Sequence, residues 1–145
     1  CYEIFSSMQE NIKPGQTNHD YARAVLDKGG GKWVGNLKFQ GKTWGPTYPE
    51  PGRYFGSGGH QLGLASGDPG PGIGIRSQHL NIPPFTFQVG MVLAVEVGVH
   101  EFDGSKWLYD GVKLENTGVV TENGWESFYR FPYKDLIVCG LPGEY

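Results

Sequence analysis

The sequence predicts an α+β domain, in which two helices are followed by a set of antiparallel strands. Three observations lead to this fold class. Apolar residues recur at helical spacing near the N-terminus, later segments alternate or are rich in β-branched side chains, and Gly, Asn and Asp turns separate those segments. The chain has 145 residues, which is enough for one domain with an apolar core.

The two helices are expected at residues 2–12 and from Thr17 to about Gly29. In the first, apolar residues are spaced by one helical turn, and Lys-Pro-Gly at 13–15 ends the pattern. In the second, Thr17 is the expected N-cap and Asp20 stands three residues later, which is the spacing of a capping box. The glycines that begin at Gly29 end this helix.

The remainder of the chain is predicted to be strands and loops. Residues 29–59 contain no predicted helix, and a short hairpin is expected there, between 33–39 and 41–44. The β-branched or alternating segments of the second half predict strands at 91–100, 111–122 and 125–131. Glu-Asn-Gly at 122–124 predicts the hairpin turn between the last two strands.

Composition and motif spacing exclude several functional classes. The net charge is −3 and no stripe of Lys or Arg occurs, so neither a nucleic-acid partner nor a membrane is expected. The longest apolar run, at 91–99, is interrupted by Glu96 and is too short to span a bilayer. Gly-Lys-Thr at 41–43 lacks the glycine five residues earlier that a phosphate loop requires. The two cysteines provide no disulfide framework and no metal-binding spacing.

Two glutamates and a histidine are the candidate chemical groups. Glu96 lies within an apolar strand, Glu115 lies on one face of an alternating strand, and His60 is expected on a glycine-flanked turn. A carboxylate between apolar neighbours is costly unless it is paired, protonated or bound to a cation. Carboxylate and imidazole donors suit Mn, Fe, Co or Zn. The pattern leaves two interpretations open. In the first, the three residues form a metal site. In the second, Glu115 is paired with Lys113 or solvated, and Glu96 lies at a sheet edge. Taken alone, the pattern favours the second.

Four ordered sequence blocks cover nearly the whole chain. They are NIKPGQTNHDYARAVL at 11–26, GHQLGL at 59–64, GMVLAVEVGVH at 90–100, and GVKLENTGVVTENGWESF at 111–128, which is followed by RFPYKDLI. In this order they resemble the C-terminal part of the pita-bread metallopeptidase domain of methionine aminopeptidases, Xaa-Pro aminopeptidases and prolidases. Each block alone is a weak signal, whereas the ordered set is specific.

The resemblance implies that residues 1–145 form a single, incomplete pita-bread domain that lacks its N-terminal half, with a curved antiparallel sheet after the helices. It implies a metal-dependent peptide hydrolase, similar to Xaa-Pro aminopeptidases or dipeptidases, in which a metal-bound hydroxide attacks the substrate. His60, Glu96 and Glu115 would be metal ligands, and His60 and Glu96 would also be catalytic. A complete site would hold two divalent ions (Mn, Co, Zn or Fe). This chain supplies only part of the ligands for these ions and, by itself, could hold no ion.

Departures from the family pattern concern the rest of the site. The family's two aspartate ligands lie upstream of the Lys-Pro-Gly turn, in a region that this sequence does not contain. The family's second histidine corresponds to Gly67, and His79 is the candidate that replaces it. Lys113 stands where the family has Arg, without the bidentate fork, and His100 stands where it has Tyr. Lys113, His79 and His100 are therefore the candidate substrate-binding residues.

Three functions remain open at this stage. The first is the peptide hydrolase, whose expected partners are a short peptide substrate and a complementary N-terminal segment or second subunit. The second is an inactive family member that binds peptides or proteins through the aromatic-rich residues 33–55. The third is a metal-free amidinohydrolase like the creatinase branch of the fold, against which the two glutamates speak. In each case residues 65–85 are the expected specificity loop.

Overall fold

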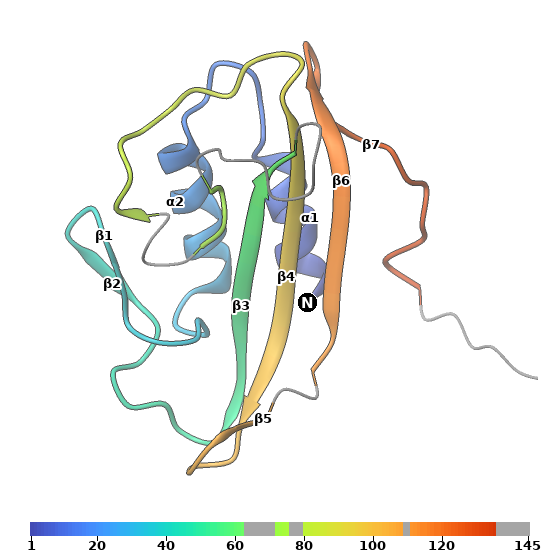
Figure 1. The fold of residues 1–145 in the computed structure, drawn as a ribbon. Coiled ribbons are helices and arrows are strands. Elements are labelled where there is room, and N and C mark those ends of the chain that lie inside the picture. Colours follow the sequence, from blue (N-terminus) through green and yellow to red (C-terminus); the bar gives the residue numbers. More distant parts are fainter. Residues whose placement is uncertain (63–71, 76–79, 109–110, 136–145) are drawn as a thin grey trace, which may run out of the picture.

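The computed structural model describes residues 1–62, 72–75, 80–108 and 111–135 (Figure 1). Its helices are α1 (Tyr2–Glu10) and α2 (Asn18–Gly29). Its strands are β1 (Leu37–Phe39), β2 (Lys42–Trp44), β3 (Gly52–Gln61), β4 (Val92–Phe102), β5 (Trp107–Leu108), β6 (Lys113–Thr121) and β7 (Gly124–Ser127). Two helices precede an antiparallel sheet, which confirms the predicted α+β class.

Helix α2 begins with the predicted capping box. The backbone N–H of Asp20 donates to Thr17 Oγ1 at 3.1 Å, and the backbone N–H of Thr17 donates to Asp20 Oδ2 at 3.1 Å. Both the hydroxyl and the backbone N–H of Thr17 favour the ionised carboxylate. They therefore hold the pKa of Asp20 below its usual value.

Helix α2 ends against an indole ring. Trp33 is fully buried, and its Nε1 donates to the carbonyl oxygen of Leu26 at 3.0 Å. A side chain at Gly29 would collide with this ring, because an added Cβ would lie 2.5 Å from Trp33 Nε1. The glycine at the end of the helix therefore also makes room for a core residue. No helix in the described part of the chain combines the length and apolarity that crossing a membrane requires.

The main sheet has the strand order β3-β4-β6-β7, and β5 pairs with the end of β4. All of these pairs are antiparallel. In the register of the central strands, Glu96 of β4 lies opposite both Gly58 of β3 and Glu115 of β6. Thr121 pairs with Gly124, so the predicted hairpin turn joins β6 to β7.

The short hairpin β1–β2 forms a separate two-stranded sheet, as predicted for this aromatic segment. Its contact with α2 is made through Arg23, whose guanidinium carbon lies 4.9 Å from the centre of the Trp44 ring. The Lys42 ammonium also reaches α2, where it lies 2.7 Å from Asp27 Oδ1. The hairpin is therefore held on the helix by cation–π and ionic contacts.

The two faces of the main sheet differ in chemistry. Leu93, Val95 and Val97 alternate along β4, are fully buried, and belong to the core that the helices complete. Helix α1 lies against β4 and β6 on this side (Figure 1). Because successive side chains of a strand point to opposite faces, Glu96 points away from the helices. The face opposite the helices is therefore the one that carries the polar groups.

Strand β3 differs from the sequence expectation. His60 was expected on a glycine-flanked turn, whereas it lies in a strand of ten residues. Glycine weakens a strand signal, so the run at 56–59 has the composition of a loop. Because β3 pairs along β4, Glu96 lies on a central strand. The interpretation of Glu96 as a residue at a sheet edge was therefore wrong.

Candidate functional site

Three neighbouring strands bring the candidate metal ligands to one face of the sheet. Glu96 and Glu115 are directly opposite each other, and His60 lies two residues beyond Gly58, which is opposite Glu96. His60 Nε2 lies 3.8 Å from Glu96 Oε1. The other ring nitrogen, Nδ1, lies 3.0 Å from the carbonyl oxygen of Gln61, which fixes the ring with Nε2 toward the glutamate.

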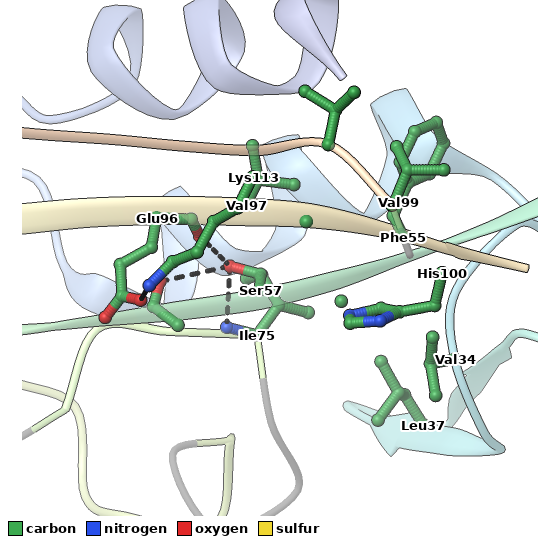
Figure 2. Close-up of a pocket in the computed structure, with 15 residues that line it drawn as sticks. Val34, Leu37, Phe55, Ser57, Ile75, Glu96, Val97, Val99, His100 and Lys113 are labelled. Atoms are coloured by element: carbon green, nitrogen blue, oxygen red, sulfur yellow. Dashed lines mark hydrogen bonds and ion pairs between the residues drawn. The ribbon is translucent and has the colours of Figure 1, made fainter. Parts of the chain in front are cut away.

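Lys113 joins the two glutamates. Its Nζ lies 2.7 Å from Glu96 Oε2 and 3.0 Å from Glu115 Oε2, and Figure 2 shows the first of these pairs. Like charges directly opposite in a sheet destabilise it, and the ammonium offsets this repulsion. The hydrogen bonds to Glu96 and Glu115 raise the pKa of Lys113 above its usual value. The pairing of Glu115 with Lys113, one of the two interpretations of the sequence, is present, and Glu96 shares the same cation.

The glycines of β3 make room for side chains of β4. A Cβ added at Gly58 would lie 3.0 Å from the Glu96 carboxylate, and one added at Gly56 would lie 2.7 Å from His100 Nε2. Both positions lie on the face that carries Glu96. The two glycines are two residues apart, as positions on one face of a strand are, but the side chains that explain them come from β4, much later in the chain.

A cleft lies beside this cluster. It has a volume of about 600 Å³ and contains Glu96 and Lys113 together with His100. Figure 2 shows Val34 and Leu37 near the His100 ring, apart from the Glu96–Lys113 pair. The cleft therefore offers charged groups and an apolar wall to one small ligand. Ile75, which lies outside the strands, also lines the cleft.

The remaining candidate residues lie around this cleft. His60 and Glu115 flank Glu96 on the neighbouring strands but are not among the residues that line the cleft. Their side chains are 35% and 47% exposed, compared with 18% for Glu96, so Glu96 is the most enclosed of the three. His79 and most of the expected specificity loop 65–85 lie outside the described residues.

A comparison with protein-family models matches residues 1–122 to metallopeptidase family M24. The chain belongs to this family. The match includes both helices and the strands through β6, which confirms the resemblance to the pita-bread metallopeptidase domain. M24 members are hydrolases of the metallopeptidase type and generally depend on divalent metal ions. A comparison with curated proteins found no match.

The three candidate ligands bear on the metal dependence of the M24 family. One imidazole and two carboxylates are donors that Mn, Fe, Co and Zn accept. The Lys113 ammonium already stands between the carboxylates of Glu96 and Glu115, so the two glutamates do bind a shared cation. In the geometry described here, no three His, Cys, Asp or Glu side chains of the described residues are grouped to hold a metal. The donors fit a divalent ion in chemical type, and Lys113 is the cation that the two glutamates contact in this structure.

Proposed function

We propose that this M24 member is a metal-dependent peptide hydrolase of the Xaa-Pro aminopeptidase or dipeptidase type, and that its described residues form part of the catalytic site. The observation that supports this most is the gathering of His60, Glu96 and Glu115 on one sheet face from three strands. A carboxylate pair opposite each other in a sheet is unfavourable without a cation, which argues for a functional reason to keep both.

In this proposal His60, Glu96 and Glu115 hold the divalent metal, which is Mn, Co, Zn or Fe. A bound ion would supply Lewis-acid polarisation of the scissile carbonyl and an activated water. Glu96 Oε1, on the side that faces His60, accepts the proton of the attacking water as general base. His60 Nε2 lies 3.8 Å from this oxygen, and both residues are assigned to catalysis in this proposal.

The substrate in this proposal is a short peptide. A cleft of about 600 Å³ is within the usual size range of small-ligand sites. Its apolar wall at Val34, Leu37 and Ile75 suits an uncharged side chain or a proline ring. Lys113 and His100 lie in the same cleft and can contact polar groups of the peptide. The preference for proline is inferred from the family resemblance alone.

The proposal includes a complementary N-terminal segment or a second subunit. Three side-chain ligands cannot enclose two divalent ions, so further ligands must come from elsewhere. Exposed aromatic side chains beyond β7 are consistent with a covering partner, because large exposed apolar patches mark interaction surfaces. These side chains are those of Phe128 (54% exposed), Tyr129 (60%) and Phe131 (54%).

The proposed hydrolase can be tested with metal-stripped protein and its complementary segment, assayed on short peptides with and without proline after adding Mn²⁺, Co²⁺ or Zn²⁺. We expect metal-dependent hydrolysis, and a loss of about 100-fold or more in Glu96→Gln, because the general base is removed. Glu101→Gln is the matched control, since Glu101 is an exposed residue near the end of the same strand. Unchanged turnover in Glu96→Gln would show that this carboxylate is not the base.

An inactive peptide-binding protein is the second candidate, and it is favoured by one observation. Lys113 pairs with both glutamates, so the described site has a counter-cation without a metal. In that case peptides would bind in the cleft without turnover, whichever metal is added. Binding measured by calorimetry, together with the absence of hydrolysis in the complete assembly, would decide for this function.

A further inference from the structure

The Lys113 ammonium occupies the position between two carboxylates that a shared cation would need. Glu96 and Glu115 face each other across the β4–β6 pair, and Lys113 Nζ lies 2.7 and 3.0 Å from one oxygen of each. We propose that Lys113 is an internal counter-cation of this glutamate pair, that a divalent ion must displace it, and that Lys113 thereby sets the metal affinity of the site. This inference rests on the proposed metal-dependent function.

Displacement is required by charge and by space. An ion that bridges both glutamates would use the oxygens that now accept hydrogen bonds from Lys113, and two cations repel at such short distances. The His60 side of Glu96 stays available, because His60 Nε2 faces Oε1 while Lys113 binds Oε2. Competition is therefore confined to the oxygens between the two glutamates.

Displacement is also feasible. The Lys113 side chain is 58% exposed and lines the cleft, so its ammonium has water and space to move into. A lysine ammonium is a strongly hydrated charge on a flexible stem, and its release therefore costs little beyond the two hydrogen bonds. A lysine ammonium is therefore easier to displace from the two carboxylates than the planar guanidinium of an arginine would be.

The test compares the metal affinities of wild type and Lys113→Met. Methionine keeps much of the apolar stem and removes the charge, so the metal-free glutamates repel and an incoming ion meets no competitor. We expect Mn²⁺ to bind Lys113→Met about tenfold or more tighter than wild type, the fold-change that a hydrogen bond to a charged group commonly represents. Metal-free Lys113→Met should also unfold at a lower temperature, and Mn²⁺ should raise its midpoint more than that of wild type.

Lys42→Met is the matched control. Lys42 forms an ion pair of the same length, 2.7 Å to Asp27, and its side chain is 54% exposed, which is close to the value for Lys113. This pair joins β2 to α2 and is not part of the glutamate cluster. Lys42→Met should therefore leave Mn²⁺ affinity at the wild-type value.

The measurement is isothermal titration of MnCl₂ into the chelator-stripped full chain, with circular dichroism to verify folding. If wild type binds Mn²⁺ and Lys113→Met binds equally or more weakly, the counter-cation is excluded while the proposed metal site stands. If none of the variants binds Mn²⁺, the inference is overturned, because Lys113 then controls no metal affinity of this chain. The proposed hydrolase is judged separately, by the turnover assay on the complete assembly. Lys113→Gln, which is uncharged and can donate a hydrogen bond, replaces the methionine variant if that one does not fold, and it should also bind more tightly than wild type.

Discussion

At the scale of single residues, the site depends on a glycine of β3 that leaves room for a carboxylate of β4. Gly58 has no side chain, and the Glu96 carboxylate packs so close to it that an added Cβ would lie only 3.0 Å away. The Lys113 ammonium then forms ion pairs with this carboxylate and with that of Glu115. Burial of Glu96 is tolerable because a cation is always near it, either the ammonium of this chain or the metal that we propose.

Gly58→Ala tests this close approach. The added methyl group would lie 3.0 Å from the Glu96 carboxylate, which must then shift away from Lys113 and His60. We expect a loss of stability of about 1–3 kcal/mol, measured by urea unfolding, because the site is already filled. Gly31→Ala is the control, since a Cβ at this exposed position meets nothing within 4 Å. Equal stability of the two variants would contradict the packing described for Gly58.

At the scale of secondary-structure elements, the helices and the central strands share a core on the sheet face opposite the site. Strand β4 has one apolar face, with Leu93, Val95 and Val97 buried toward the helices, and Glu96 on the other face. Helix α2 contributes Tyr21, Val25 and Leu26 to the same core. The sheet face that carries the polar groups is therefore fixed by packing on the opposite face.

Thr17→Ala tests the start of α2. Loss of the capping hydroxyl should lower the free energy of unfolding by about 1 kcal/mol at neutral pH. Hydrogen bonding to Thr17 lowers the pKa of the Asp20 carboxyl in the folded protein. The stability that this hydrogen bonding contributes is therefore fully present above the unfolded pKa of the carboxyl, and it is lost as the pH falls through the lower folded pKa. The difference between wild type and variant in urea unfolding should therefore shrink in acid. Thr43→Ala, at an exposed position of β2, is the control, and a difference that grows on acidification would contradict the capping role.

At the scale of the whole molecule, the helices, the second-half strands and the family could be predicted from the sequence. Some signals are local, such as the capping residues Thr17 and Asp20 and the β-branched run around Glu96. Each of these elements can be predicted from its own segment of the sequence. Strand β3 could not be predicted, because its glycines are explained by Glu96 and His100, which come from a strand much later in the chain. The shared role of Lys113 depends in the same way on the β4–β6 register.

The pattern of residues alone made His60, Glu96 and Glu115 the candidate ligands, but it favoured an ordinary interpretation over a metal site. The resemblance carried by the four ordered blocks shifted the prediction to a metal site. The structure places the three side chains on one face of three adjacent strands. Their role in binding a metal stays a prediction, and it is the claim on which the proposed hydrolase and the counter-cation both depend.

The most direct test of this claim is the anomalous scattering of Mn²⁺ in a crystal of the protein with the complementary segment that we propose. The account predicts a peak at about 2.0–2.5 Å from a nitrogen of His60 and from carboxylate oxygens of Glu96 and Glu115, with Lys113 moved away from both glutamates. An ion bound at other residues, or Lys113 still between the glutamates at full Mn²⁺ occupancy, would contradict it.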